Sequence, residues 1–503
     1  ATLSDRLAAR MVDAGVEPGD RVALLLPKSP LAIVAIHAVL KAGGVYVPLD
    51  AESPTPRLGR IIRAAEPTLL LAEPGSAARL LGLAESLALP LVGSVDDEPV
   101  VGPDGQVLTG FTRSEWDVPV GTPPDRRGRP DDAAHILFTS GSTGDPKGVV
   151  ITHANVGAFV SWAVDYFGIR ATDRVSGHPP LHFDLSTFDI YGAFAARAEL
   201  HLVPPSLSMN PRRLASFIRD RQLTQWFSVP SVLTYLARFD AVAEGDFPAL
   251  ERLLWCGEVL PTPVLCHWMR RLPHVRFTNL YGPTEATIAS SYFTLPEVPQ
   301  DEAQPVPIGE ACADEELLVL DGDLHEVPVG EIGDLYIGGA GLSPGYWRDG
   351  DKTASAFLAD PRSPQVGRRV YRTGDLASVD SEGLVHFHGR ADSQIKSRGY
   401  RIELGEVENA LNAVDGIREC AVVGVESDDF EGTAICAAYA SATTLEPPEL
   451  RSELVRSLPS YMLPSRWLSL EVLPKNLNGK VDRPELRKRF LAERLDREAG
   501  RSG

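Results

Sequence analysis

The chain has 503 residues, 44% of them hydrophobic and 23% charged, which is the composition of a folded globular protein. Its 49 basic and 68 acidic residues give a formal charge of −19, so nucleic acid and anionic membranes are poor partners. Five cysteines without a CxxC pair fit neither a disulfide framework nor a structural zinc site, and we expect a reducing, cytoplasmic environment.

Strand and helix patterns alternate from the N-terminus onward. Residues 21–26 and 44–49 are predicted strands, and the apolar residues 31–41 between them are a predicted helix that is too short to span a membrane. This alternation predicts α/β units with parallel or mixed sheets. Further short β-rich runs follow at 68–71, 201–203, 225–229 and 253–255.

The texture of the sequence changes after about residue 305. Many glycines and short strand-like runs predict a β-rich subdomain over about 305–389. Asp482 to Glu485 has the pattern of a capping box and predicts the start of a final helix. Between these two stretches, helix, strand, strand and helix patterns occupy 406–414, 419–425, 435–439 and 448–458.

We therefore expect an α/β protein with two domains. The large N-terminal domain, residues 1–390, combines α/β subdomains with the β-rich subdomain. The small, mobile C-terminal domain has an α+β pattern and spans residues 394–503. The polar residues 391–393 join the two domains, and Asp392 is the candidate hinge.

The segment from Ile136 to Gly148 carries the clearest chemical signal. A predicted strand runs into a loop of glycines, hydroxyls and one lysine, and such a loop offers backbone N–H groups and hydroxyls to phosphate oxygens. The Walker A pattern GxxxxGK[ST] does not fit this loop. Taken by itself, the loop is equally well explained as an ordinary Gly/Ser turn.

Six ordered motifs resemble those of the adenylate-forming superfamily, which includes acyl-CoA synthetases, luciferases and the adenylation domains of nonribosomal peptide synthetases. The phosphate loop Thr139-Ser-Gly-Ser-Thr-Gly-Asp-Pro-Lys-Gly148 is the most specific of them. The resemblance extends over essentially the whole chain. The other five motifs are residues 40–50, 279–285, 371–376, 389–406 and 478–483, with the sequences LKAGGVYVPLD, NLYGPTE, YRTGDL, GRADSQIKSRGYRIELGE and NGKVDR.

The resemblance implies an ATP-binding site. Tyr281 would offer its ring to adenine, and Asp375 would accept hydrogen bonds from the ribose hydroxyls. Glu285 is a hard oxygen donor suited to Mg²⁺, although a solvated turn carboxylate is the alternative. The implied ATP-binding residues are Thr139, Ser140, Gly141, Ser142, Thr143, Gly144, Lys147, Gly257, Glu258, Asn279, Tyr281, Gly282, Thr284, Asp375, Phe387 and Arg390.

Lys480 lies in the last motif and is the implied catalytic residue. Its charge would bridge the substrate carboxylate and the α-phosphate as negative charge develops. Outside such a motif, a loop lysine is usually only solvated.

The run from Leu181 to Asp189 is implied to select the substrate. Ser186 and Asp189 form a capping-box pattern, which would place Asp184 just ahead of the helix. In amino-acid-activating members of the superfamily an aspartate at this position binds the substrate ammonium, whereas mere loop polarity is the alternative for Asp184. The implied pocket residues are Phe183, Asp184, Leu185, Phe188, Val232, Leu254, Cys256, Leu280, Ile288 and Ala289.

Apart from Asp184, the implied pocket is uncharged, and the bulk of Phe188 should shorten it. A small apolar amino acid is therefore expected: proline, alanine, 2-aminobutyrate or valine. The run around Phe183 looks most similar to free-standing enzymes that activate proline and other small amino acids.

The resemblance thus implies a two-step ligase that uses ATP and Mg²⁺. The amino acid becomes aminoacyl-AMP, and the phosphopantetheine thiol of a carrier protein then takes it as a thioester, in nonribosomal peptide, antibiotic or related secondary-metabolite biosynthesis. The alternatives are a ligase of the same superfamily that joins a β-amino acid or another carboxylate to CoA or a carrier, a luciferase-like oxygenase, and a non-catalytic nucleotide-binding homologue. The chain starts inside the expected first motif and has no carrier sequence after the last, so we expect missing N-terminal residues and a carrier supplied in trans or cut away.

Overall fold

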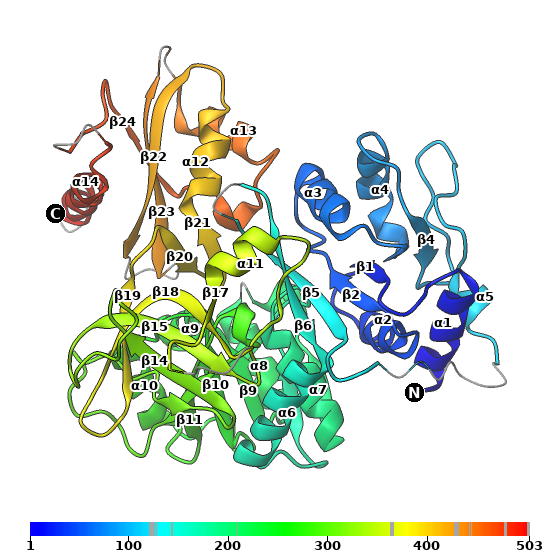
Figure 1. Cartoon of the computed structure of the whole chain (residues 1–503), viewed down its shortest axis with the longest axis horizontal. Coiled ribbons are helices and arrows are strands. Elements are labelled where there is room, and N and C mark those ends of the chain that lie inside the picture. The colour runs from blue at the N-terminus through cyan, green and yellow to red at the C-terminus, as the bar shows by residue number, and fades with distance from the viewer. Residues whose placement is uncertain are drawn as a thin grey trace. The chain divides into compact units, whose positions relative to one another are not determined.

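The computed structural model describes residues 1–119, 126, 128–141, 144–208, 210–362, 367–426, 432–441, 443, 445–476 and 480–499. These residues form two compact units (Figure 1). The first unit consists of Ala1–Ala51, Ile61–Phe138 and Gly148–Ala391. The second consists of Glu52–Arg60, Thr139–Lys147 and Asp392–Gly503. Over the described part of the chain, no helix combines the length and the apolar character that a membrane span requires.

The first unit begins with a seven-stranded sheet in which β1 lies between β2 and β3. The strand β1 (Arg21–Leu25) pairs in parallel with β2 (Val45–Pro48) and β3 (Leu69–Ala72), with Arg21 opposite Val45 and Val22 opposite Leu69. These strands are almost entirely buried, as the continuous apolar runs of the sequence predict for a parallel sheet covered on both faces. The sheet order is β16 (Gly345–Tyr346), β6 (Lys147–Thr152), β5 (Ala133–Thr139), β2, β1, β3 and β4 (Leu91–Ser94).

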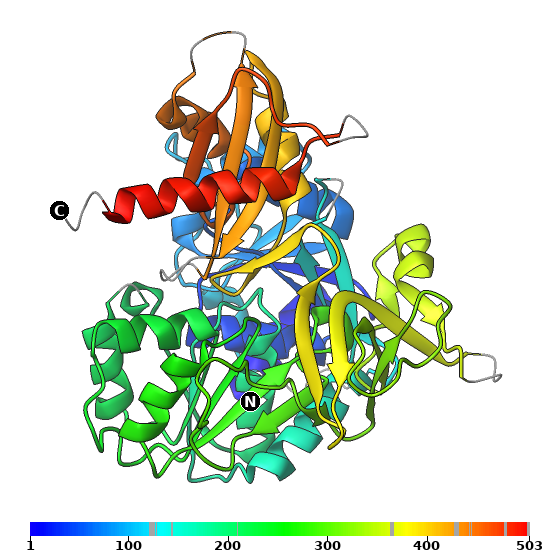
Figure 2. The same cartoon turned by 90° about the vertical axis from the view of Figure 1, so that its left-hand side faces the viewer.

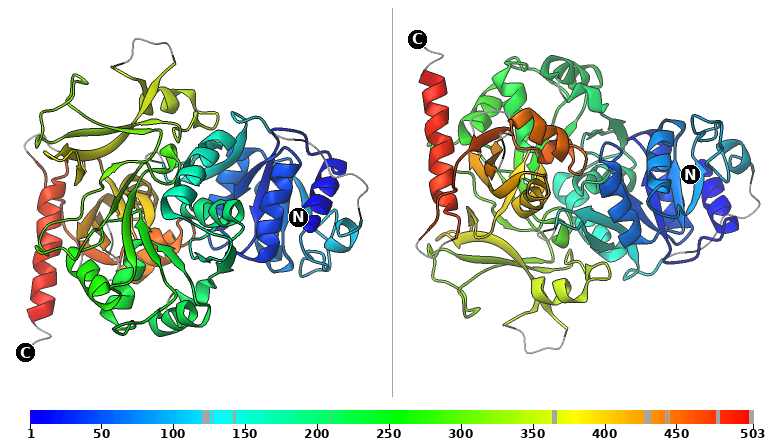
Figure 3. Two further views of the ribbon diagram at one scale, coloured as in Figure 1. Left: turned by 90° about the horizontal axis from the view of Figure 1, so that it is seen from below. Right: turned by 90° about the horizontal axis from the view of Figure 1, so that it is seen from above.

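Helices cover both faces of this sheet. The helix α2 (Pro30–Lys41) begins where Ser29 caps the Ala32 N–H and Pro30 occupies the first turn, and it packs on α1 (Thr2–Asp13). Figures 1 and 3 show α2 and α4 on opposite sides of the blue strands. The remaining short helices of this region are α3 (Thr55–Ala65), η1 (Pro74–Ser76), α4 (Ala77–Ala84) and α5 (Arg113–Trp116).

The second sheet of the first unit also has seven strands, and five of them are parallel. Because parallel strands point the same way, the loops that follow their carboxyl ends gather along one edge of the sheet, where ligands of α/β proteins bind. The sheet order is β13 (Glu310–Ala311), β12 (Ser291–Thr294), β11 (Arg276–Tyr281), β10 (Arg252–Cys256), β9 (Gln225–Ser228), β7 (Arg174–Gly177) and β8 (Glu199–Leu202), with β12 antiparallel to its neighbours β11 and β13. Its helices are α6 (His153–Phe167), α7 (Leu185–Ala196), η2 (Pro205–Leu207), α8 (Pro211–Asp220), α9 (Pro230–Arg238), α10 (Thr262–Arg271) and η3 (Thr284–Ala286).

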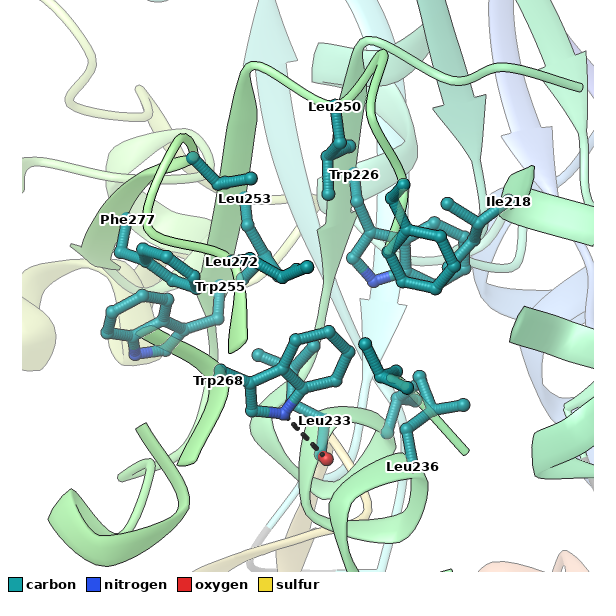
Figure 4. Close-up of a cluster of buried hydrophobic side chains, with 14 of the residues drawn as sticks. Ile218, Trp226, Leu233, Leu236, Leu250, Leu253, Trp255, Trp268, Leu272 and Phe277 are labelled. Atoms are coloured by element: carbon teal, nitrogen blue, oxygen red, sulfur yellow. Dashed lines mark hydrogen bonds between the residues drawn. The ribbon is translucent and has the colours of Figure 1, made fainter. Parts of the chain in front are cut away.

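A large apolar cluster lies between this sheet and helices α8, α9 and α10 (Figure 4). It contains the fully buried indoles of Trp226, Trp255 and Trp268. The Trp268 Nε1–H donates a hydrogen bond of 3.1 Å to the Leu233 carbonyl, so the one polar atom of this indole is satisfied inside the core.

The stretch that the sequence predicts to be β-rich contains a five-stranded antiparallel sheet. The strand β18 (Arg369–Val379) pairs with β15 (Gly333–Gly339), β17 (Phe357–Ala359) and β19 (Val385–Arg390), and β14 (Glu315–Leu320) pairs with β15. The helix α11 (Gly350–Ala356) precedes β17. The sequence prediction of an α/β architecture with a large N-terminal domain is confirmed.

The C-terminal part of the second unit is a three-stranded sheet with helices on both faces. Alternate residues of β22 (Ile417–Glu426) and β23 (Thr433–Ser441) pack against α12 (Leu404–Asn412) and α13 (Pro447–Leu454) on one face and against α14 (Arg483–Ala499) on the other. Figure 2 shows the red α14 lying across the strands. The other elements are the hairpin of β20 (Gln394–Ser397) and β21 (Tyr400–Glu403), η4 (Ser460–Met462) and β24 (Arg466–Ser469).

Two helix predictions in this part differ in outcome. Asp482 does cap α14, because its Oδ1 accepts a 3.0 Å hydrogen bond from the Glu485 N–H. The predicted helix over 448–458 is too long: α13 ends at Leu454, and the chain continues in turns toward Pro459, before which the helical conformation is disfavoured.

Candidate active site

Asp375 lies at the centre of a buried polar cluster in the first unit. Its side chain is 3% exposed as part of β18 and accepts hydrogen bonds from the Tyr281 hydroxyl and the Arg390 guanidinium. Arg390 also donates to the Thr373 carbonyl at 3.1 Å, and the Asp375 N–H donates to the Thr373 hydroxyl at 2.9 Å. The carboxylate implied to hold ribose is thus fixed by groups from three strands, because β18 and β19 pair Asp375 with Arg390 and β11 ends at Tyr281.

Tyr281 joins this cluster to the adenine-binding motif. Burial and the neighbouring Asp375 carboxylate raise the pKa of Tyr281 well above its usual value, so the hydroxyl stays protonated and remains a donor. The rings of Tyr281 and Phe387 have centroids 6.3 Å apart, which places both aromatic groups beside Asp375. The structure therefore brings together Tyr281, Asp375 and Arg390, which the sequence places in three separate motifs, and Phe387, which lies just before the third.

Glu285, the candidate Mg²⁺ ligand, is fully buried in η3. Its Oε1 accepts a 2.8 Å hydrogen bond from the Tyr346 hydroxyl, and its backbone carbonyl accepts one of 2.9 Å from the Ser343 N–H. Among the residues that the structure describes, no group of three or more His, Cys, Asp and Glu side chains is arranged to hold a metal. A single carboxylate fits Mg²⁺, which commonly takes one or two protein carboxylates and completes its shell with phosphate oxygens and water. No sequence motif predicts Tyr346, which donates the hydrogen bond to this carboxylate.

Asp184 contacts the adenine-binding segment directly. The Thr284 hydroxyl donates a hydrogen bond of 2.7 Å to Asp184 Oδ2. Asp184 lies in the loop between the end of β7 and the start of α7, and Thr284 follows β11, so both come from the carboxyl edge of the second sheet. The Asp184 carboxylate, which is suited to bind an ammonium group, therefore contacts Thr284, the residue just before Glu285.

The capping box predicted from Ser186 to Asp189 does not exist. The helix α7 starts at Leu185, and the Thr187 N–H already donates to the Asp184 carbonyl at 2.8 Å. Ser186 is inside the first turn and bonds back to the Phe183 carbonyl at 2.7 Å. Asp189 therefore lies one turn into the helix, where its side chain is buried instead of capping.

Most of the implied pocket residues share one apolar cluster. Phe188 packs edge-on against Phe159 and Phe227, at centroid distances of 5.4 Å and 5.7 Å. A Cβ atom at Gly192 would lie 2.9 Å from the Phe188 ring, so the small residue one turn later leaves room for that ring. The implied pocket residues in this cluster are Leu185, Phe188, Leu254, Cys256, Leu280, Ile288 and Ala289.

The structure does not bring Val232 together with that group. Val232 packs in the cluster between the second sheet and helices α8, α9 and α10, whereas Val229, which follows β9, contacts both clusters. Val229 is thus a pocket candidate that the sequence missed. Phe183 is half-buried at the start of the substrate run, next to the His182 ring.

A strained turn follows the adenine-binding segment. Thr287 and Ile288 adopt φ values of 57° and 73°, which β-branched residues rarely do. The Thr287 hydroxyl donates to the Gly341 carbonyl at 2.7 Å, and a Cβ at Gly282 would meet the Ala289 backbone at 2.6 Å, so the turn is held tightly against the preceding strand. Such strain concentrates at functional sites, but no sequence pattern reveals it.

The other residues of the first unit that are predicted to bind ATP form turns and hydrogen bonds in neighbouring loops. Gly257 follows β10 with a φ of 99°, and the Glu258 carboxylate accepts a 3.1 Å hydrogen bond from the Ser231 N–H at the start of α9. The Asn279 amide donates to the Pro307 carbonyl at 2.8 Å.

The phosphate loop belongs to the second unit. Gly144 has a φ of 91° and its N–H donates to the Gly141 carbonyl at 2.9 Å, while a Cβ at Gly141 would lie 2.2 Å from the Asp145 carbonyl oxygen. Both glycines are therefore required by the tight turn. The Ser140 hydroxyl donates to the Arg401 carbonyl at 2.7 Å, and Thr139 and Lys147 end β5 and begin β6. Ser142 and Thr143 lie outside the described residues.

Lys480 and Asp392 also lie in the second unit. Lys480 is exposed; its N–H donates to the Asn476 side chain at 3.1 Å, and its carbonyl accepts from the Asn476 N–H at 2.8 Å. Asp392 is exposed, is the first residue after the division between the units, and accepts a 3.0 Å hydrogen bond from the Gln394 N–H that starts β20.

Known proteins are similar to this chain in sequence. The family model described as AMP-binding enzyme matches residues 1–347, and the one described as AMP-binding enzyme C-terminal domain matches residues 406–480. The chain is 36% identical to an L-proline–[L-prolyl-carrier protein] ligase of Streptomyces coelicolor, over 95% of this chain and 89% of that protein. It is also 33% identical to tyrocidine synthase 3 of Brevibacillus parabrevis over 98% of this chain, but spans only 7% of that protein.

The fold matches solved adenylation domains as well. The Vibrio cholerae adenylation domain AlmE, solved in complex with glycyl-adenosine-5'-phosphate, superposes with a TM-score of 0.82 at 28% identity and covers 98% of this chain and 92% of its own. The resemblance seen in the six motifs is therefore confirmed: the chain belongs to the AMP-binding enzyme family.

Proposed function

We propose that the chain activates an amino acid with ATP as aminoacyl-AMP and then passes it to the thiol of a carrier protein. The observation that carries this proposal is the hydrogen bond between Thr284 and Asp184. It places a carboxylate suited to the substrate ammonium beside the segment that contains Glu285 and Tyr281. Amino acid adenylation needs a group that binds the substrate ammonium beside the nucleotide-binding segment. Activation of a fatty or aryl acid needs no such group.

The nucleoside would be held by the polar cluster around Asp375. With the Tyr281 hydroxyl and the Arg390 guanidinium already fixing the carboxylate, its oxygens are oriented before ATP arrives, so little side-chain freedom is lost on binding. The glycine turn of the phosphate loop would offer backbone N–H groups to the triphosphate.

Glu285 would hold Mg²⁺ in this proposal, and Tyr346 would orient its carboxylate. When bound, the ion supplies positive charge that screens the phosphate oxygens. The buried position of Glu285 keeps bulk water from competing for the carboxylate.

Two displacements make up the reaction. A carboxylate oxygen of the amino acid bonds to the α-phosphorus and the bond to the pyrophosphate oxygen breaks, with the Lys480 ammonium stabilising the negative charge on the oxygens involved. The carrier thiol then loses its proton and bonds to the acyl carbon, and AMP leaves. The second step rests on the likeness to carrier protein ligases.

We infer that the amino acid is small and apolar, with L-proline as the first candidate. Most of the implied pocket residues belong to one aromatic and aliphatic cluster, in which Phe188 packs against Phe159 and Phe227. The relative from Streptomyces coelicolor, which matches along nearly its whole length, is named for L-proline. AlmE holds a glycyl adduct, which is also small.

ATP–pyrophosphate exchange with purified chain and Mg²⁺ tests the proposal. The panel contains L-proline, L-alanine, L-2-aminobutyrate, L-valine, glycine and β-alanine, with benzoate and octanoate as acids that lack the ammonium. Exchange driven by one of the small α-amino acids is expected. Exchange driven only by β-alanine, or only by the two amine-free acids, would replace the α-amino acid by another substrate class, and no exchange with any acid would favour a non-catalytic homologue.

A further inference from the structure

Lys28 reaches from the first sheet to the loop that carries Asp184. It is the third residue after the end of β1 and precedes Ser29, the cap of α2. Its ammonium donates to the carbonyls of Gly177, His178 and Pro179 at 2.7, 2.6 and 3.4 Å. Three consecutive carbonyls face one cation only if the chain curves around it, so Lys28 fixes the path of the backbone just where it leaves β7.

Asp189 lies on α7, the helix that follows the same loop. It is 1% exposed on α7, and neither carboxylate oxygen has a partner at hydrogen-bonding geometry among the described residues. The charge of Lys28 favours its negative form. His178 itself binds Lys28 through its carbonyl.

Asp189 is buried, and Lys28 is half-buried. Burial lowers the pKa of Lys28 to about 8, an effect that Asp189 opposes, and raises the pKa of Asp189 well above its usual value. The His178 ring packs at 5.1 Å from the Trp226 ring and lies 3.4 Å from the Ser208 hydroxyl. Burial also lowers the pKa of His178 to about 3, so this ring is neutral beside the lysine.

The loop between β7 and α7 consists of residues 178–184. Lys28 fastens its first two residues, and Asp189 belongs to the helix into which it leads. Asp184 ends the loop and bonds to Thr284. A short segment held at both ends has little freedom, so the position of the Asp184 carboxylate depends on the two attachments.

We propose that Lys28 is a positioning residue that holds the start of the 178–184 loop, with Asp189 on the following helix as the nearby buried carboxylate, so that Asp184 meets the ammonium of the amino acid. Both residues lie outside the six motifs, and neither is assigned a contact with substrate. This inference rests on the proposed amino acid activation for its kinetic consequence, and on the loop geometry alone for its structural one.

The test compares two double variants that each remove one cation and one nearby carboxylate close to β7. Lys28→Met with Asp189→Asn removes the pair at the carboxyl end of β7. Arg252→Met with Asp173→Asn removes the matched pair at the amino end, where Arg252 and Asp173 lie 2.8 Å apart and are 4% and 1% exposed. Removing both partners avoids leaving one charge buried alone, which is the outcome that most endangers folding. Lys28→Arg serves as a conservative variant that keeps the charge.

Two readouts are taken at a temperature where all variants are folded. Exchange kinetics with L-proline, or with whichever panel amino acid the wild type uses best, should show a KM for the amino acid raised at least about tenfold in Lys28→Met/Asp189→Asn, with the KM for ATP within about twofold. Amide hydrogen exchange in a peptide covering 177–185 should speed up by about tenfold or more. The Arg252→Met/Asp173→Asn variant should show neither change, and Lys28→Arg should recover part of the amino acid affinity.

The proposal is overturned if the 177–185 segment exchanges as slowly as in the wild type, if the Arg252/Asp173 variant changes by the same factors, or if the two KM values rise together. A wild type that exchanges no amino acid at all would contradict the proposed function instead. Amide hydrogen exchange in the 177–185 peptide would then still show whether removing Lys28 and Asp189 loosens the loop.

Discussion

The Thr284 hydroxyl donates a hydrogen bond to Asp184 Oδ2 over 2.7 Å, although the two residues are 100 positions apart in the chain. The contact exists because β7 and β11 run parallel in one sheet and release their loops at the same edge. It couples the residue expected to recognise the amino acid to the segment expected to recognise ATP.

Replacing Asp184 should abolish recognition of the amine. In Asp184→Ala the substrate ammonium would be buried without a partner, an effect of roughly 3–5 kcal/mol, so exchange measured as kcat/KM should fall at least about 10²-fold. Thr284→Val, which removes only the bond to Asp184, should cost about 1 kcal/mol, or roughly fivefold. Activity of Asp184→Ala within a few-fold of the wild type would remove Asp184 from the pocket.

Phe188 should set the size of the accepted side chain. Phe188→Ala opens space and should shift the exchange ranking toward longer apolar amino acids by a graded amount, since one methylene discriminates by only about 1–3 kcal/mol. Gly192→Ala pushes on the Phe188 ring and should shift the ranking toward smaller side chains. Exchange rates with alanine, valine, leucine and phenylalanine measure both shifts, and an unchanged order in both variants would show that Phe188 does not line the pocket.

The Asp375 cluster should affect the nucleotide alone. Tyr281→Phe keeps the ring but removes a donor to a buried carboxylate, and hydrogen bonds to charged groups contribute about 1.5–3 kcal/mol, so the KM for ATP should rise roughly tenfold or more. Asp375→Asn should raise it further. The KM for the amino acid is the internal control, and an equal rise in both constants would mean that the cluster is structural.

Lys480 and Asp392 should separate the two half-reactions. Lys480→Ala should slow adenylation about 10²–10³-fold, as the loss of one stabilising donor does, while thioester formation from preformed aminoacyl-AMP stays near normal. Asp392→Pro should do the reverse, because a fixed φ hinders the rotation that we expect about this residue. Asp392→Asn is the control, since its amide can still accept from the Gln394 N–H. Equal loss of both steps in both variants would exclude alternation about Asp392.

Glu315 should make the protein less stable as the pH rises. Burial raises the pKa of Glu315 from 4.5 to about 8 in the folded chain, so the folded state holds a proton that the unfolded state has lost. The free energy of unfolding should therefore decline from pH 4.5 to 8 and change little from this group above pH 8. Urea unfolding of Glu315→Gln at pH 5 and pH 8 should show a smaller decline than the wild type.

Glu316 supplies the matched control for that measurement. Hydrogen bonds from Arg362 and Arg368 lower its pKa, so its contribution has the opposite sign and grows with pH. Glu316→Gln should therefore keep the decline that Glu315→Gln reduces. Identical pH profiles for the wild type and Glu315→Gln would mean that Glu315 is not buried in its proton-bound form.

Motifs and element types could be predicted from the sequence, but side-chain partners could not. The glycines, hydroxyls and apolar runs act locally, so the strand over 21–26 and the capping role of Asp482 follow from neighbouring residues. Asp189 shows the limit. Its spacing from Ser186 satisfies a capping pattern, yet a turn begun at Asp184 starts the helix earlier and carries Asp189 into the interior near Lys28. Only the packing of one sheet against another decides that outcome.

The aromatic packing around Phe188 has a consequence for attempts to redesign this chain. Phe159 and Phe167 belong to α6, Phe188 to α7 and Phe227 to β9, so the rings that would border the ligand also hold two helices and a strand together. Deleting a buried phenylalanine usually lowers stability by about 3–5 kcal/mol. Libraries that alter selectivity at Phe188 will therefore contain many unfolded members, and a screen that reads only activity will confuse lost folding with lost preference. Compensating enlargements at Gly192 or on α6 should be varied in the same library.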